Sequence, residues 1–167
     1  MTTSNASRSS GTAPIIEITW EQRDVLRKEL SSDVHAVLDD LATSAERGRG
    51  GGEDEWNMRL RADVGMWLLD DLGWDLVDSR ETYYLTVPRD RFASWLRWIR
   101  AGVEWCLSDT AKDLSNPEQA WGWYVREGHM TVAEFDVEIV ESREMCDRDL
   151  DVLRVCDELL AELETSV

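Results

Sequence analysis

The sequence predicts a mainly α fold: a single-domain helical bundle of about five helices, with a small extended or β-hairpin insert near residues 74–87. Three observations support this prediction. A chain of 167 residues has the size of one domain, and its 43% hydrophobic residues suffice for a sizeable core. Its 10 glycines and 3 prolines are too few for a turn-rich β fold. Apolar residues recur at helical spacing along most of the chain.

The N-terminal end differs in composition from the rest. Residues 1–14 are rich in Ser, Thr, Gly and Ala and cannot bury enough apolar surface to offset the entropy lost on ordering, so we expect a disordered tail before one domain over 15–167. The tail lacks the apolar segment of a signal peptide, and no stretch approaches the ~18 apolar residues of a membrane span. The three cysteines have no CxxC spacing, which favours free thiols in a reducing compartment. The expected location is therefore the cytoplasm.

The first two helices are marked by capping and glycine signals. Thr19 and Gln22 have the spacing of a capping box, and the apolar pattern after them predicts a helix from about 20 to 46. The glycine-rich stretch 47–54 ends it and leads into a second helix that stops at Gly73. A short connection of this kind predicts that the two helices pair antiparallel.

The insert is identified by a change of period. Tyr83, Leu85 and Val87 alternate with Tyr84 and Thr86, which predicts one short strand. A lone strand needs a partner, and residues 74–78 are the candidate for a small hairpin.

Two further helix starts follow. The Asn116–Pro117 pair suits the first turn of a short helix, and Thr131 with Glu134 has capping-box spacing for a final helix that reaches about 164. Residues 135–139 also alternate as a strand would, so both structures remain open for that stretch.

The charge of the chain limits its partners. The formal net charge is −17, from 35 acidic and 18 basic residues, which argues against direct binding of a nucleic-acid backbone or a membrane surface and favours a basic protein. Six acids of the final helix fall within an arc of about 80°: Asp136, Glu144, Asp147, Asp151, Glu158 and Glu162. The opposite side is apolar: Phe135, Ile139, Cys146, Leu150, Leu153 and Leu160. The acidic face is interpreted as a solvated surface, a docking face for a basic protein, or a mimic of a phosphate backbone.

Tryptophan is concentrated in the helix after Pro88. Trp95, Trp98 and Trp105 lie beside its apolar stripe, and together they widen the apolar arc to about 200°. A helix with so wide an arc is expected to be central, with the indoles in the core. The alternative is a contact surface, because Trp is enriched at binding hot spots.

Patterns that suggest catalysis are weak. Glu138 and Glu141, followed by Glu144 and Asp147, resemble the acid pairs that hold magnesium in all-helical nucleotide pyrophosphohydrolases, which makes a metal-dependent phosphohydrolase an alternative function. Magnesium, however, needs carboxylates that converge from more than one element, and these are consecutive on one helix. We assign no catalytic residue, metal ligand or cofactor from the sequence.

Two stretches, LLDDLGW at 68–74 and ETYYLTVP at 81–88, together resemble small helical proteins of unknown function from actinobacteria. The resemblance covers about residues 15–107 and implies no activity or site residue. The function that the sequence favours is a non-enzymatic, acidic protein-binding module that regulates or inhibits a basic partner. A nucleic-acid mimic that inhibits a DNA-binding protein or a defence system is the main alternative within that class.

Overall fold

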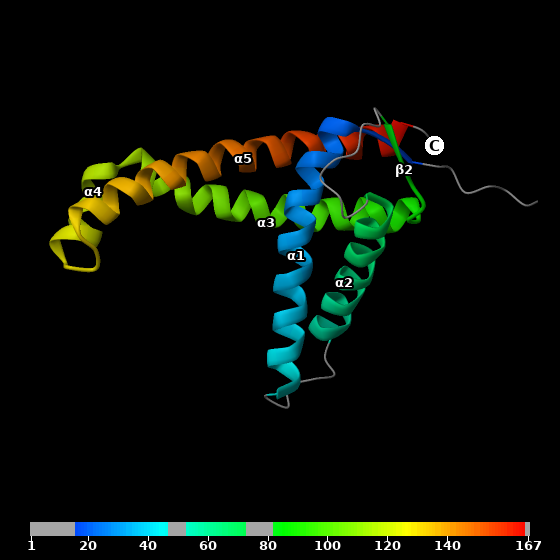
Figure 1. Cartoon of the computed structure of the whole chain (residues 1–167), viewed down its shortest axis with the longest axis horizontal. Coiled ribbons are helices and arrows are strands. Elements are labelled where there is room, and N and C mark those ends of the chain that lie inside the picture. Colours follow the sequence, from blue (N-terminus) through cyan, green and yellow to red (C-terminus); the bar gives the residue numbers. More distant parts are fainter. Residues whose placement is uncertain (1–15, 47–52, 73–81, 166–167) are drawn as a thin grey trace, which may run out of the picture.

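The computed structural model describes residues 16–46, 53–72 and 82–165. Figure 1 shows two long helices side by side, with a second helical pair that projects away from them near one end. In chain order the elements are β1 (Ile16–Thr19), α1 (Trp20–Glu46), α2 (Glu53–Leu72), β2 (Thr82–Leu85), α3 (Arg89–Ser115), α4 (Pro117–Trp121), the π-helical turn η1 (Gly122–Arg126) and α5 (Val132–Thr165). The predicted mainly α fold of five helices is confirmed.

The predicted strand is present, but its partner in the structure comes from elsewhere. β2 pairs antiparallel with β1, so that Ile16 lies opposite Leu85 and Thr19 lies opposite Thr82. The expected partner, residues 74–78, falls outside the described residues, as does the expected tail over 1–14. β1 suits this place because Ile16 and Ile18 are buried while the residues between and after them are exposed.

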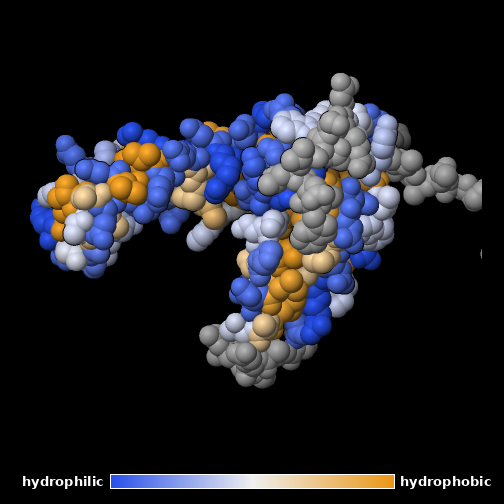
Figure 2. Space-filling view, in the orientation of Figure 1, coloured by the Kyte–Doolittle hydropathy of each residue, from blue (hydrophilic) through white to orange (hydrophobic). Residues whose placement is uncertain are grey.

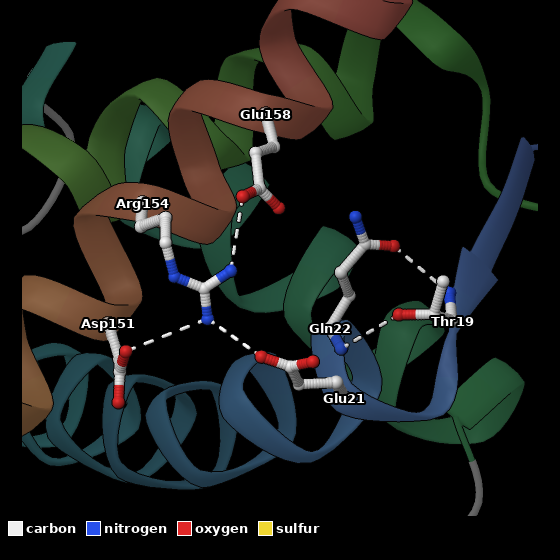
Figure 3. Close-up of polar contacts among 6 residues, drawn as sticks. All are labelled: Thr19, Glu21, Gln22, Asp151, Arg154 and Glu158. Carbon is white, nitrogen blue, oxygen red and sulfur yellow. Dashed lines mark hydrogen bonds and ion pairs between the residues drawn. The ribbon is translucent and has the colours of Figure 1, made fainter.

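The first helical pair is confirmed: α1 has its expected bounds, and α2 ends just before Gly73 as expected but begins at Glu53, inside the stretch expected to be a loop. The Thr19 backbone N–H donates to Gln22 Oε1 at 2.9 Å, and the Gln22 N–H donates to Thr19 Oγ1 at 3.2 Å, which is the capping box that the sequence predicts (Figure 3). α1 and α2 approach closely at Gly65, where an added Cβ would lie 2.5 Å from a methyl group of Val34. The glycine therefore allows the two helices to pack backbone against side chain.

Two polar side chains attach the end of α2 to its neighbours. Arg23 of α1 is buried, donates from Nε to the carbonyl oxygen of Leu72 at 2.9 Å, and lies 4.7 Å from the ring centroid of Tyr83 in β2. Asp71 accepts from the Thr86 N–H at 2.7 Å and from the Thr86 hydroxyl at 2.8 Å. The two stretches that carry the sequence resemblance thus contact each other directly.

The first half of α3 lies in the core, as its apolar arc predicts, whereas Gly102, Trp105 and Cys106 farther along the predicted arc are exposed. α3 packs along α5, and Phe92, Trp95, Leu96, Ile99 and Val103 of its first half are buried. The buried face of α5 differs from the predicted one, because Leu150 is exposed. The side chains that pack against α1 and α3 belong to a neighbouring face: Val152, Val155, Cys156, Leu159 and Leu163.

The connection between α3 and α5 has the expected caps. The Asn116 side chain accepts from the Gln119 N–H at 3.3 Å, and the Thr131 N–H donates to Glu134 Oε2 at 2.7 Å. α5 is continuous from Val132 to Thr165, which decides the open question at 135–139 in favour of a helix. No helix in the described part of the chain is long and apolar enough to cross a membrane.

Candidate binding surfaces on the helical arm and at its base

The far halves of α3 and α5 form an arm that extends beyond the α1–α2 pair. We call residues 104–148, which the structure describes throughout, the arm (Figure 1). The main core contains no residue of this segment, because in α3 the core ends at Val103 and in α5 it begins with Val152. The α5 part of the arm is about 25 Å long at the helical rise of about 1.5 Å per residue. At the tip of the arm the short α4 and η1 contact α3 and α5, whereas the long helices α1 and α2 pack against the body.

The six acids of the predicted binding face are all exposed, and the structure divides them into two sets. Three lie on the arm and make no ion pair within the described residues: Asp136, Glu144 and Asp147, called here the arm acids. Three lie on the body and are called the body acids: Asp151, Glu158 and Glu162. Arg154 contacts Asp151 at 3.6 Å and Glu158 at 3.1 Å, and it also reaches Glu21 of α1 at 2.9 Å (Figure 3). Arg154 thus joins α5 to α1 through Glu21, and Asp151 and Glu158 of its own helix pair with the same guanidinium.

Exposed apolar side chains lie among the arm acids. Val140 is 53% exposed and is four residues from both Asp136 and Glu144, so it is next to both on the helix surface. Val137 is 56% exposed and borders the same face. Figure 2 shows apolar patches surrounded by hydrophilic surface over the α4 end of the arm. This face therefore combines negative charge with accessible apolar groups.

The three tryptophans of α3 have different environments. Trp95 is fully buried and stacks against Phe92 with ring centroids 6.3 Å apart. Trp98 is half-buried, and Trp105 is 72% exposed at the base of the arm. The expected core role therefore applies to Trp95, whereas Trp105 belongs to the surface that a partner can reach.

A cleft of about 330 Å³, called here the base cleft, lies where the arm leaves the body. Helices α1, α2, α3 and α5 all contribute to its lining, which includes carboxylates and arginines beside the apolar side chains of Ile99, Val103, Trp105 and Met145. Its volume is at the lower end of the range for small-ligand sites, about 300–1,000 Å³. Sequence patterns could not indicate this cleft, because side chains from four helices must assemble to form it.

Charges in the base cleft are not balanced. Arg61 donates from two guanidinium nitrogens to Asp33, so the charges of these two side chains compensate each other. Arg148 Nε is 3.6 Å from Glu29 Oε1 and 4.0 Å from Asp149 Oδ1, so one cation stands between two carboxylates at distances too long for strong hydrogen bonds. Asp149 is only 5% exposed, and the described residues donate no hydrogen bond to its side chain. Three carboxylates thus share two arginines, which leaves one negative charge uncompensated.

Burial changes the acidity of both carboxyls. It raises the pKa of Asp149 above its ordinary value near 3.8, and Arg148 offsets only part of this effect. Burial likewise raises the pKa of Glu29; Arg148 lowers it, and the charges of Asp149 and Asp33 raise it further. Ionising either group in the folded protein therefore costs free energy.

We expect Asp149→Asn to stabilise the protein at neutral pH. A raised pKa in the folded state means that the wild type loses stability as pH rises from about 4 through the folded pKa of Asp149, and the loss persists at pH 7. Asparagine removes this cost, while Glu29, Asp33, Arg61, Arg148 and the thiol of Cys106 still surround the position. Thermal denaturation should show a melting temperature higher by about 2–4 °C for each kcal/mol gained.

The matched control for this prediction is Glu141→Gln, which removes one exposed acid from the same helix. Its melting temperature should stay within about 1–2 °C of the wild type, as for most surface substitutions. The stability difference between Asp149→Asn and the wild type should shrink towards pH 3, where Asp149 is protonated in both states. An equal or lower melting temperature for Asp149→Asn at pH 7 would show that its carboxylate is adequately compensated.

The possible metal ligands and the two histidines occupy separate places in the described part of the chain. Within the described ranges, no group of three or more His, Cys, Asp or Glu side chains is arranged to hold a metal ion. His35 Nδ1 is 2.6 Å from the Ser31 carbonyl oxygen, and the His129 ring lies 5.2 Å from that of Trp123. A larger cavity of about 670 Å³ lies near the tip of the arm, where Lys112 pairs with Asp109 and the Tyr124 hydroxyl donates to Asp113 at 3.2 Å. Each charged side chain of that cavity thus has an ion-pair or hydrogen-bond partner.

Comparison with known proteins adds no assignment. No protein family, curated protein or solved structure matches this chain.

Proposed function

We propose that this protein is a non-enzymatic, acidic binding module whose arm docks on a basic partner protein and thereby regulates or inhibits it. The observation that carries the proposal is the position of Val137 and Val140, about half exposed, on the same face as the arm acids. A face that served solubility alone would gain nothing from exposed valines, whereas protein interfaces combine an apolar centre with a polar rim.

The build of the arm supports the same proposal. Only the short α4 and η1 accompany the two long helices in the described part of the arm, which leaves apolar surface that a partner can bury, and exposed Trp105 and Trp123 add to it. The net charge of −17 steers a basic partner towards the protein before contact. The body acids contribute less to docking, because Arg154 already neutralises part of their charge.

The test is affinity capture from cells of the native host with two full-length variants that remove equal charge. The arm variant carries Asp136→Asn, Glu144→Gln and Asp147→Asn, and the body variant carries Asp151→Asn, Glu158→Gln and Glu162→Gln. We expect the wild type and the body variant to retain a basic protein that salt elutes, and the arm variant to lose it. Both variants should keep melting temperatures near that of the wild type, since exposed ion pairs contribute about 0–1 kcal/mol.

Two results would contradict the proposal: retention of the same proteins by the arm variant, or capture of no basic protein by the wild type. If the captured partner binds DNA and duplex DNA displaces it from the wild type, the arm acts as a nucleic-acid mimic, which is a special case of the same docking face.

A further inference from the structure

We propose that the base cleft binds the positively charged head group of an amphipathic organic cation, an alkylguanidinium or alkylammonium, on the carboxylates of Glu29 and Asp149. This site contains neither the arm acids nor the exposed valines of the docking face, and it shares Trp105 with the surface of the arm. The proposal of a cation site does not depend on whether the arm binds a partner.

The charged side chains that line the base cleft carry one more negative than positive charge. Arg61 compensates the charge of Asp33, and Arg148 alone faces both Glu29 and Asp149 at 3.6 and 4.0 Å. One monovalent cation would bring the cleft to neutrality, and it would give the buried Asp149 the hydrogen bond that the described residues do not supply.

The lining of the base cleft combines apolar side chains with carboxylates. Val103, Trp105 and Met145 offer apolar surface beside the carboxylates, which suits an alkyl stem that follows a charged head group. The indole of Trp105 also offers a ring face that attracts cations. A bare metal ion is a poorer occupant, because the described His, Cys, Asp and Glu side chains are not arranged as metal ligands.

The cleft is open to solvent at Gly102. This residue lines the cleft, is exposed, and an added Cβ would meet no atom within 4 Å. A larger side chain can therefore obstruct the entrance without a clash in the core. Gly102→Phe serves as a blocking variant that leaves all the charges of the cleft in place.

The experiment titrates n-butylguanidinium, and its neutral counterpart n-butylurea, into the full-length protein at constant ionic strength, followed by calorimetry. We expect saturable one-to-one binding of the cation and no measurable binding of the urea. Asp149→Asn should weaken binding of the cation by about tenfold or more, the effect of losing one charge-assisted hydrogen bond. Gly102→Phe should weaken it similarly, and Glu141→Gln should change it by less than about twofold.

Equal binding of the cation and the urea, or equal affinity of Asp149→Asn and the wild type, would overturn the proposal. So would an equal loss in Glu141→Gln, because it would show that the cation only joins the counter-ion atmosphere of an acidic protein. The cation has two possible sources, the side chain of a partner protein and a free small molecule. A blocked Gly-Arg-Gly peptide distinguishes them. Binding of the peptide would identify the cleft as a pocket for a partner's side chain, and its exclusion while n-butylguanidinium binds would identify a free small cation.

Discussion

Replacing Trp95 by alanine is expected to lower the free energy of unfolding by about 3–5 kcal/mol, the range for removing a large aromatic side chain from a core. Trp95 is fully buried in the first half of α3 and stacks against Phe92. The matched control is Trp105→Ala in the same helix, where the side chain is exposed and the cost should stay within about 0.5 kcal/mol. Denaturant unfolding of both variants measures the difference.

The indole N–H of Trp95 allows a sharper version of this prediction. It is buried, and no described residue accepts its hydrogen bond, so the fold already carries the cost of an unsatisfied donor. Trp95→Phe removes that donor while keeping an aromatic ring, and it should cost less than half as much as Trp95→Ala. Similar stability losses for Trp95→Ala and Trp105→Ala would contradict the assignment of Trp95 to the core.

The second large effect is expected at Arg23. Arg23→Met should lower the free energy of unfolding by about 2–4 kcal/mol, since it removes a charged hydrogen bond to the Leu72 carbonyl and a cation–π contact with Tyr83. The terminal carbonyl groups of α2 favour a nearby cation, and no basic residue lies in the last turn of α2 itself.

Chemical denaturation should rank the variants at this position. Arg23→Lys keeps the charge but lacks the planar guanidinium fork, so its stability should fall between those of the wild type and Arg23→Met. Arg91→Met, at an exposed position of α3, should change the free energy of unfolding by no more than about 0.5 kcal/mol. Equal free energies of unfolding for Arg23→Met and Arg91→Met would contradict the role of Arg23 in attaching the end of α2 to α1 and β2.

Local signals in the sequence predicted the local structure well. The capping boxes at Thr19 and Thr131 depend on residues three positions apart, and both form with the bonds that their spacing predicts. The end of α2 just before Gly73 is likewise a local effect. The partner of β2 was missed because β1 is only four residues long and its residues precede their partners by 63–69 positions, so no short-range pattern connects them.

Residues that depend on several helices were harder to predict. The tryptophan pattern identified the apolar side of α3 but could not show that the core ends at Val103, because that depends on where α1 and α2 are placed. Asp149 had a usable signal. It precedes Cys156 and Leu163 by seven and fourteen residues, so it shares the buried face of α5. An acid at such a position indicates a buried carboxylate, although the sequence cannot show what surrounds it.

The proposal that the arm docks on a basic partner depends on the exposed valines among the arm acids. The dissociation constant of the captured partner tests it most directly. It should be measured for the wild type and for Val137→Ser with Val140→Ser in one chain. Both valines are about half exposed, so the double variant should keep the melting temperature of the wild type within about 2–4 °C. We expect the double variant to bind about tenfold more weakly, since the partner would no longer bury the two apolar side chains. An unchanged dissociation constant in the folded double variant would show that this face of the arm is a solvated surface and not a docking site.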